Sequence, residues 1–434
     1  MAEVTYQNTF QGGQVLLPPS KSVAHRAMLC AALSRGRCLL SHMAGSQDIA
    51  ATARAIQALG GRAVLDEAAG ALLVEGQNIG SAPGGAIDCG ESGSTLRFLI
   101  PIAAALGGTW TFTGSGRLPQ RPLDVYRDLL PGHGVSYRDP GDESLPLTIA
   151  GQLTPGGYQV PGNISSQFIT GLLLALPLLP GDSDILLTTP LESEGYVNLT
   201  LQAMAQFGVT ALPTERGWHV PGHQSYRPQN APVEGDWSQA AFFLAMAALA
   251  PGGEMVELSG LSPQSRQGDK ACVELFQNFG LSIRWQGDRL LARNPHAGEP
   301  FHGLRGQAID AAQIPDMVPA LSVCAALSRG ETRIYNAQRL RLKESDRLAA
   351  MEQALTALGG KVQATADGLV IQGVETLSGG LAQGVNDHRV VMALAAAALG
   401  SRRPVTVTDA WSIRKSYPKF FTDFESLGGK AHVV

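Results

Sequence analysis

The chain has 434 residues, enough for two or three domains, and 44% of them are hydrophobic, as in an ordinary soluble enzyme. Its 33 basic and 37 acidic residues nearly balance, so the bulk charge gives no sign of nucleic-acid binding. The apolar runs span about a dozen residues and are interrupted by Pro or Gly, which favours core helices over membrane spans.

Two further features of composition narrow the class of protein. The N-terminus lacks the basic and apolar segments of a signal peptide, so the sequence predicts a cytoplasmic location. Five cysteines are scattered without a Cys-x-x-Cys pair, and we therefore expect neither a disulfide nor a structural zinc site.

The first predicted helix follows a pair of prolines. Ser20 is a good N-cap, the Ala/Leu-rich run 27–33 continues the helix, and a following glycine ends it. Lys21, Ser22 and Arg26 lie near its start, where cations oppose the helix dipole. A bound anion would be attracted by the dipole, the backbone N–H groups and both cations. The alternative to an anion-binding site is a basic turn that only contacts solvent.

This pattern of a polar start, an Ala/Leu-rich run and a closing glycine occurs six times, about 70 to 80 residues apart. Between these runs, an amphipathic helix that ends in glycine and leads into an alternating strand also recurs six times. The five further buried helices are predicted at Ser92–Gly107, Ser165–Gly181, Ser238–Gly252, Asp316–Gly330 and Asp387–Gly400.

The repeats predict an α/β protein of two lobes with three units each. Because the long helices are apolar on most sides, they must be buried, and their polar starts are expected to converge. The last unit lacks a return strand, whereas residues 1–17 form a strand without a unit. Placing that segment in the last lobe predicts lobes of 20–233 and of 1–19 plus 234–434. The two proline-bearing crossings would permit hinge closure over a ligand.

Polar groups gather at the later helix starts as well. Residues 89–97 form a glycine-rich turn whose amides could hold an anion, although a simple helix cap explains it equally well. Arg117 and Arg121 lie in a proline-stiffened loop. Residues 163–167 offer hydroxyls and an amide suited to a phosphate or sugar-like hydroxyls.

The densest charged stretch is 339–347. Its charges could belong to a site for an anionic ligand, or they could form the ion pairs of an exposed amphipathic helix start. Asp316 begins an apolar helix, and cations recur in segments 386–389 and 415–418. So many cations at helix starts indicate a ligand that carries several anionic groups.

Together these motifs resemble the 5-enolpyruvylshikimate-3-phosphate synthase family, collinearly along the whole chain. The resemblance rests on Ser20-Lys21-Ser22-x-x-x-Arg26, Ser165-Ser166-Gln167, Lys343-Glu344-Ser345-Asp346-Arg347, Asn386-Asp387-His388-Arg389 and Lys415-Ser416-Tyr417-Pro418. It implies an inside-out α/β barrel fold, with two lobes of three βαβαββ units and helix N-termini facing the interlobe cleft. It also implies transfer of the enolpyruvyl group of phosphoenolpyruvate to the 5-hydroxyl of shikimate 3-phosphate in aromatic amino-acid biosynthesis. Neither a metal nor an organic cofactor is implied.

The resemblance also implies the site residues, which divide by role. The implied catalytic residues are Lys21, Asp316, Glu344 and His388. Shikimate 3-phosphate would be held by Lys21, Ser22, Arg26, Ser165, Ser166, Gln167, Ser193, Tyr196, Asp316, Arg339 and Lys343. Phosphoenolpyruvate would be held by Lys21, Gly93, Arg121, Gln167, Arg347, Arg389 and Lys415.

The implied chemistry requires fixed cations, because two anionic substrates repel each other. Asp316 would take the proton from the attacking hydroxyl, and Glu344 would protonate the methylene carbon with help from Lys21. The first lobe would mainly bind shikimate 3-phosphate, and the second would carry the catalytic carboxylates and part of the phosphoenolpyruvate site. The expected protein is a monomer with no nucleic-acid or membrane partner.

The chain departs from the family pattern at three places. Glu91 and Arg339 stand where the family often has Asn, and Glu194-Gly195 replaces a frequent Lys-Pro pair. These differences bear on ligand geometry and inhibitor sensitivity. We expect a nearby arginine to neutralise Glu91, with Arg339 of the other lobe as the first candidate and Arg97 or Arg121 as the local ones.

Two rival functions remain. A UDP-N-acetylglucosamine enolpyruvyl transferase usually has Lys-Asn at the first helix and a loop cysteine near position 115, and this chain has neither. A non-catalytic binder of phosphorylated metabolites would follow if Glu91 had disabled the donor subsite.

Overall fold

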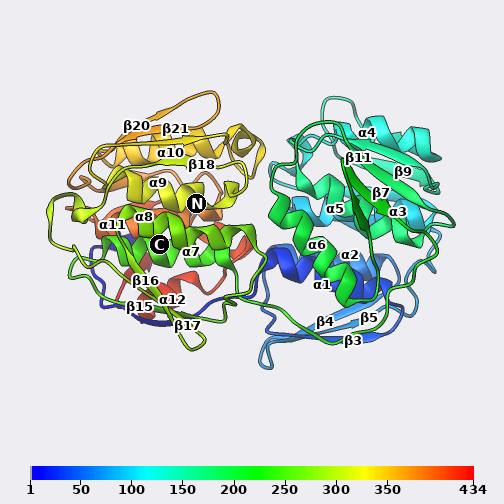
Figure 1. Cartoon of the computed structure of the whole chain (residues 1–434), viewed down its shortest axis with the longest axis horizontal. Coiled ribbons are helices and arrows are strands. Elements are labelled where there is room, and N and C mark those ends of the chain that lie inside the picture. Colours follow the sequence, from blue (N-terminus) through cyan, green and yellow to red (C-terminus); the bar gives the residue numbers. More distant parts are fainter. Residues whose placement is uncertain (1) are drawn as a thin grey trace. The chain divides into compact units, whose positions relative to one another are not determined.

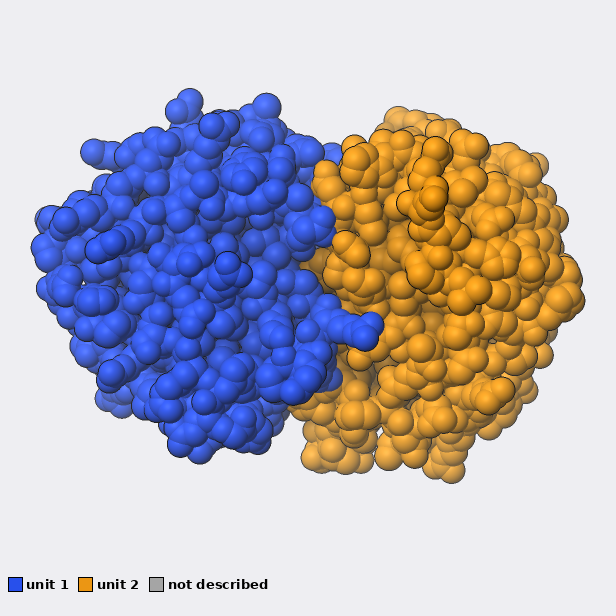
Figure 2. Space-filling model, viewed as in Figure 1, with its two compact units in different colours: residues 1–18, 234–434 blue, residues 19–233 orange. Residues whose placement is uncertain are grey.

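The computed structural model describes residues 2–434; Met1, which the predicted second lobe includes, lies outside them. The chain forms two compact units, coloured separately in Figure 2. Unit 1 combines the chain up to Pro18 with Glu234–Val434, and unit 2 is Pro19–Val233.

Unit 2 alternates helices and strands along the chain (Figure 1). Its helices are α1 (Lys21–Leu33), α2 (Gln47–Ala58), α3 (Gly93–Leu106), α4 (Asp124–Leu129), α5 (Ser166–Ala175) and α6 (Glu194–Gln206). Its strands are β3 (Arg37–Ser41), β4 (Arg62–Asp66), β5 (Ala71–Glu75), β6 (Gly84–Asp88), β7 (Thr109–Thr113), β8 (Val135–Arg138), β9 (Leu147–Gly151), β10 (Gly157–Val160), β11 (Ser183–Leu187), β12 (Leu212–Thr214), β13 (Gly217–Val220) and β14 (Ala231–Pro232).

Unit 1 has the same alternation. Its helices are α7 (Trp237–Leu249), α8 (Cys272–Phe279), α9 (Val318–Ala326), α10 (Arg347–Ala357), α11 (His388–Leu399) and α12 (Phe420–Ser426). Its strands are β1 (Val4–Gln7), β2 (Gly13–Leu16), β15 (Val256–Ser259), β16 (Ser282–Gln286), β17 (Arg289–Arg293), β18 (Ala308–Asp310), β19 (Glu331–Tyr335), β20 (Lys361–Ala364), β21 (Leu369–Gln372), β22 (Gly380–Ala382), β23 (Val405–Val407) and β24 (Lys430–Val433).

Within residues 2–434 the strands form six four-stranded sheets, three in each unit, all with one connectivity. In the second repeat, β6 pairs in parallel with β7, β7 pairs antiparallel with β9, and β9 pairs antiparallel with β8. The buried helix α3 connects the parallel pair, and α4 precedes the hairpin. The order is therefore βαβαββ, and the predicted fold class is confirmed.

Three strands complete sheets that are distant in sequence. β1 lies between β23 and β24 and supplies the return strand that the sixth repeat lacks. β2 pairs in parallel with β15, and β14 pairs in parallel with β3. The leading strand of the fourth repeat is therefore followed in the chain by the first helix of the first repeat.

Each unit buries its long helices under its sheets. In unit 1, every residue of α7 is buried, and in α11 all twelve residues from His388 to Leu399 are buried. By contrast, α8 buries Cys272, Phe276 and Phe279 along one face, which suits a helix between the core and solvent. In Figure 1, the β20–β21 hairpin and strands β15–β17 lie at opposite edges of this unit, with helices between them.

Two observations concern the character of the core. The thiols of all five cysteines are free and buried, with Cys30 in α1 and Cys324 in α9 among them. Within residues 2–434, no helix has the length and apolar content that crossing a membrane requires.

Candidate active site

The start of α1 places a lysine beside a carboxylate. Ser20 caps the helix, because its Oγ accepts a hydrogen bond from Val23 N. Lys21 Nζ lies 2.7 Å from Oδ2 of Asp48, which belongs to the first turn of α2. Both side chains retain limited exposure, 16% for Lys21 and 10% for Asp48. The ion pair thus holds the lysine side chain at the N-terminus of α1, largely shielded from solvent.

Arg26 is buried and connects three helices. Its Nε donates to Thr200 Oγ1 at 2.8 Å, and its Nη2 donates to Thr170 Oγ1 and the carbonyl oxygen of Tyr196. Its Nη1 donates to the carbonyl oxygen of Ser22 at 2.8 Å. Burial lowers the pKa of the Arg26 guanidinium to about 10, so it remains charged at neutral pH. The alternative of a solvated basic turn is therefore wrong for this residue.

The start of α3 brings Gly93 against Arg121. A Cβ atom built on Gly93 would collide with the Arg121 guanidinium, so the glycine permits this close approach. The loop that carries Arg121 is fixed by Ser144, whose Oγ donates to the Arg121 carbonyl oxygen at 2.8 Å. A predicted cation and a predicted anion-binding turn therefore meet within unit 2.

Gln167 joins the starts of α3 and α5. Its Nε2 donates to Ser94 Oγ at 3.0 Å, and its Oε1 accepts a bond of 2.7 Å from Arg97 Nη1. Ser165 caps α5 by accepting from Gln167 N. Arg97, which the sequence analysis did not assign to the site, thereby orients the amide of a predicted ligand residue.

The start of α6 contributes Ser193 and Tyr196. Ser193 has a φ of 55°, an uncommon value for a residue other than glycine. It directly precedes the helix, and its carbonyl oxygen accepts from Tyr196 N. Unit 2 thus gathers the predicted residues from α1, α3, α5 and α6.

In unit 1, one arginine binds three carboxylates. Arg347 Nη1 lies 2.8 Å from Asp316 Oδ1, Nη2 lies 2.7 Å from Glu344 Oε2, and Nε lies 2.8 Å from Asp387 Oδ2. The Arg347 side chain is only 1% exposed. Although burial acts to lower the pKa of this guanidinium, the three carboxylates raise it above its usual value. Arg347 begins α10 and forms ion pairs, as the alternative of an amphipathic helix start predicted, but the expected exposure is wrong for this side chain.

Asp316 is also shared with two other cations. Its Oδ2 lies 3.1 Å from Arg389 Nη2, and its Oδ1 lies 3.6 Å from Lys343 Nζ. Burial would raise the pKa of this carboxyl, but Arg389, Lys343 and Arg347 outweigh burial and hold it well below its usual range. Asp316 is therefore firmly ionised in the absence of ligands.

The other predicted residues of unit 1 lie at the surrounding helix starts. Lys415 Nζ donates to the Asn386 carbonyl oxygen at 2.6 Å, next to α11. Arg339 Nη2 donates to the Ala312 carbonyl oxygen at 2.6 Å, which is a contact within unit 1. His388 is buried in the first turn of α11 beside Asp387.

The structure also identifies residues that sequence reasoning missed. Asp48 pairs with Lys21, Arg97 orients Gln167, and buried Asp387 caps α11 while binding Arg347. Asp387 belongs to the motif of residues 386–389, but the sequence analysis assigned it no role. Asp48 belongs to no motif, and it lies 27 residues from Lys21 in the sequence. No local spacing could have revealed that pair.

Glu91 lies within unit 2 against the loop that follows β7. A Cβ atom on Gly116 would collide with the Glu91 carboxylate, which defines where this side chain lies. Its pairing with Arg339, which belongs to unit 1, stays a prediction.

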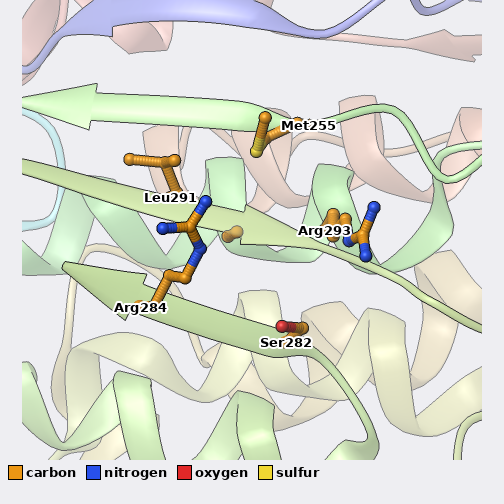
Figure 3. A pocket seen from close by; sticks show the side chains of 6 residues that line it. Met255, Ser282, Arg284, Leu291 and Arg293 are labelled. Carbon is orange, nitrogen blue, oxygen red and sulfur yellow. The ribbon is translucent and has the colours of Figure 1, made fainter. Parts of the chain in front are cut away.

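A hollow of about 190 Å³ lies elsewhere on unit 1, over β16 and β17. Figure 3 shows Arg284, Leu291, Arg293 and Met255 around it. None of its lining residues is a predicted site residue, so we assign the site to the helix starts.

Comparison with known proteins identifies the family. Residues 6–424 match the model of the family described as EPSP synthase (3-phosphoshikimate 1-carboxyvinyltransferase). A protein of that name from Clostridium perfringens is 44% identical over 420 residues, which cover 96% of each chain. The chain belongs to the EPSP synthase family. A further 3-phosphoshikimate 1-carboxyvinyltransferase, from Clostridium kluyveri, is 42% identical over 431 residues, covering 99% of this chain and 98% of that protein.

Solved structures agree with this family at the level of the fold. EPSP synthase from Acinetobacter baumannii superposes with a TM-score of 0.79 at 24% identity, covering both chains completely. The enolpyruvyl transferase NikO from Streptomyces tendae gives a TM-score of 0.77 at 16% identity, over 100% of this chain and 98% of that one. The repeated βαβαββ architecture is therefore that of the EPSP synthase family.

Proposed function

We propose that the protein is a transferase that moves the enolpyruvyl group of phosphoenolpyruvate to the 5-hydroxyl of shikimate 3-phosphate and releases phosphate. The observation that carries the proposal is identity of 42% and 44% to relatives named for this reaction, over nearly their full length. The reaction belongs to the shikimate pathway of aromatic amino-acid biosynthesis. The comparisons give no support to a UDP-sugar transferase or to a non-catalytic binder.

Shikimate 3-phosphate is assigned mainly to unit 2. Hydroxyls at the starts of α5 and α6, together with Ser22, can donate to its phosphate and hydroxyl oxygens. Arg26 is bonded to neutral oxygens, and among residues 2–434 no carboxylate forms an ion pair with it, so its positive charge can attract an anion. Lys343 and Arg339 of unit 1 are assigned to the same substrate.

Phosphoenolpyruvate is assigned to cations of both units. In unit 2, Lys21 lies at the start of α1 and the Arg121 guanidinium lies against the start of α3. The backbone N–H groups of both helix starts also attract anions. In unit 1, Arg347, Arg389 and Lys415 are the assigned groups. Fixed cations offset the repulsion between the two anionic substrates and cost no reorganisation during the reaction.

Proton transfer is assigned to the carboxylates around Arg347. Asp316 accepts the proton of the attacking hydroxyl. Glu344 pairs with Arg347 as a carboxylate, so it must first take up a proton before it delivers one to the methylene carbon with assistance from Lys21. Three cations make Asp316 a weak base in the absence of ligands. Phosphoenolpyruvate bound at Arg389 and shikimate 3-phosphate bound at Lys343 would place negative charge near Asp316, which raises the pKa of its carboxyl when the substrates are present. His388, beside Asp387, is assigned to the same cluster.

Three further assignments stay predictions: a cytoplasmic location, a monomeric state and a reaction without metal or organic cofactor. Phosphate release from phosphoenolpyruvate in the presence of shikimate 3-phosphate tests the function directly. We expect steady release with this pair and none when UDP-N-acetylglucosamine replaces shikimate 3-phosphate. Release with the UDP-sugar alone as acceptor would overturn the proposal.

A further inference from the structure

A chain of hydrogen bonds runs through the interior of unit 2 without using any predicted site residue. His25 Nδ1 lies 2.7 Å from Thr52 Oγ1, and Thr52 Oγ1 lies 2.7 Å from Thr95 Oγ1. Thr95 Oγ1 lies 2.8 Å from Ser92 Oγ. All four residues are buried, and none is more than 1% exposed. The chain therefore connects α1, α2 and the start of α3, which lie in the same unit (Figure 1).

The chain has a defined direction. The Thr95 hydroxyl donates to Ser92 Oγ, so its oxygen can only accept from Thr52. The Thr52 hydroxyl is then committed to Thr95, and Thr52 Oγ1 must accept from His25 Nδ1–H. Within residues 2–434, Nε2 of His25 has no hydrogen-bond partner. If the neutral imidazole is protonated at Nδ1, Nε2 carries only a lone pair. Burying this lone pair without a partner costs less than burying an unsatisfied N–H group.

The charge state of His25 agrees with this direction. Burial, reinforced by the neighbouring charges of Lys21 and Arg26, lowers the pKa of His25 well below its usual value. The ring is consequently neutral near pH 7 and has a single N–H group to donate.

The hydrogen-bond chain lies one helix turn beyond the Lys21–Asp48 ion pair, between the same two helices. Lys21 and His25 are four residues apart on α1, and Asp48 and Thr52 are four residues apart on α2. Residues at this spacing lie on the same face of a helix. The Lys21–Asp48 ion pair and the His25–Thr52 hydrogen bond thus form two successive links between the same pair of helices.

The far end of the chain reaches the turn that contains Gly93. Ser92 Oγ accepts from Thr95 N at 3.2 Å as well as from Thr95 Oγ1, and this caps α3 directly before Gly93. The Arg121 guanidinium lies against Gly93. The chain therefore begins one turn behind Lys21 and ends beside the turn that Arg121 contacts.

We propose that His25, Thr52, Thr95 and Ser92 are positioning residues that fix the front of α3, with Gly93 and Arg121, relative to Lys21 for phosphoenolpyruvate binding. Apolar side chains of similar size would fill this interior without the cost of burying polar groups. A directed chain instead fixes the three helices in one register. The inference rests on the proposed function.

The main test compares two substitutions of Thr52. Thr52→Val removes the hydroxyl and keeps the shape, whereas Thr52→Ser keeps the hydroxyl. We expect Thr52→Val to raise the KM for phosphoenolpyruvate about tenfold and to leave the KM for shikimate 3-phosphate within about twofold, with Thr52→Ser close to wild type. An unchanged KM for phosphoenolpyruvate, or an equal rise in both KM values, would overturn the inference.

Thr332→Val is the matched control. Thr332 is buried in β19 of unit 1 and accepts a hydrogen bond of 3.3 Å from Gln307 N. We expect this variant to lower the unfolding temperature about as much as Thr52→Val while changing neither KM. A control that raised the KM for phosphoenolpyruvate equally would show a general effect of lost stability and contradict a positioning role.

A measurement on the wild-type protein tests the chain itself. Nitrogen-15 NMR of the imidazole rings, with the His25 signal assigned from its loss in His25→Gln, should show a neutral ring protonated at Nδ1 between pH 6 and 8. A ring protonated at Nε2 would overturn the chain even if Thr52→Val did not fold. Absence of phosphate release by the wild type would instead reject the proposed function, and the NMR result distinguishes these two failures.

Discussion

The two units cap their helices with different chemistry. In unit 2, serines cap α1, α2, α3 and α5, and each hydroxyl oxygen accepts from a backbone N–H group. In unit 1, aspartates cap α7, α10 and α11. Both side chains satisfy backbone donors, but a carboxylate also neutralises the positive end of the helix dipole. Serine leaves that end available for an external anion.

Two buried arginines show the same contrast between the units. Arg26 in unit 2 is bonded to hydroxyl and carbonyl oxygens, whereas Arg347 in unit 1 is bonded to three carboxylates. The pKa of Arg26 is lowered by burial, and that of Arg347 is raised by its carboxylates despite burial. The buried Arg26 of unit 2 is thus surrounded by hydroxyl and carbonyl oxygens, whereas the charge of the buried Arg347 of unit 1 is balanced by carboxylates.

The largest expected effect is the loss of Arg347. Arg347→Met leaves three carboxylates around an uncharged side chain, and breaking a buried pair in this way costs about 3 to 5 kcal/mol. Urea unfolding measures the effect, with Arg402→Met on the surface of the same unit as control. The control should change the free energy of unfolding by less than about 0.5 kcal/mol. Equal midpoints for the two variants would contradict the charge balance described for unit 1.

Lys21→Met should affect catalysis more than stability. The variant loses a cation at the front of α1, and we expect turnover to fall at least about 100-fold, equivalent to about 2.7 kcal/mol. Because the Lys21–Asp48 pair is largely buried, the variant should also lose some stability, but less than Arg347→Met, in which three carboxylates lose a partner. Turnover within about threefold of wild type would remove Lys21 from the mechanism.

The two units should respond to acid in different pH ranges. The pKa of His25 is lowered in the folded state, so the stability it contributes is present above its unfolded value of about 6.5 and is lost as pH falls below it. The pKa of Asp316 is lowered as well, and its contribution is lost only below about pH 4. We would measure the unfolding temperature between pH 8 and 3. Compared with wild type, its dependence on pH should be weaker near pH 6 in His25→Asn and weaker below pH 4 in Asp316→Asn. The reverse assignment would contradict both pKa directions.

Gly93→Ala should weaken donor binding selectively. The added methyl group would displace the Arg121 guanidinium, and we expect the KM for phosphoenolpyruvate to rise about tenfold, or about 1.4 kcal/mol. Gly132→Ala is the control, because a Cβ there meets nothing within 4 Å. A normal KM in Gly93→Ala would show that Arg121 does not contact this substrate.

The smallest expected effect concerns Glu91 and Arg339. If they neutralise each other, Glu91→Asn, Arg339→Asn and the double variant should show coupling in phosphoenolpyruvate affinity beyond about 0.5 kcal/mol. Calorimetric titration of the four proteins measures it. Additive effects would leave Glu91 balanced within unit 2, where its carboxylate lies against Gly116.

The sequence by itself determined the repeated architecture and the motifs at the helix starts. Capping residues, apolar runs and closing glycines are local signals, because the backbone geometry of a helix depends on residues within a few positions. The same signals indicated Lys21, Ser165 and Arg347 as residues at helix starts. The family comparison agreed with the fold class predicted from the repeats and with the function that the family resemblance implied. Their individual ligand contacts stay predictions.

Only the tertiary structure decided which groups meet. Asp48 reaches Lys21 across 27 residues, and Gln167 reaches Ser94 across 73. The His25–Thr52–Thr95 chain crosses three helices, and β1 joins a sheet formed by the end of the chain. Such pairs depend on how buried helices and sheets pack, and nothing in the local sequence of either partner specifies the other.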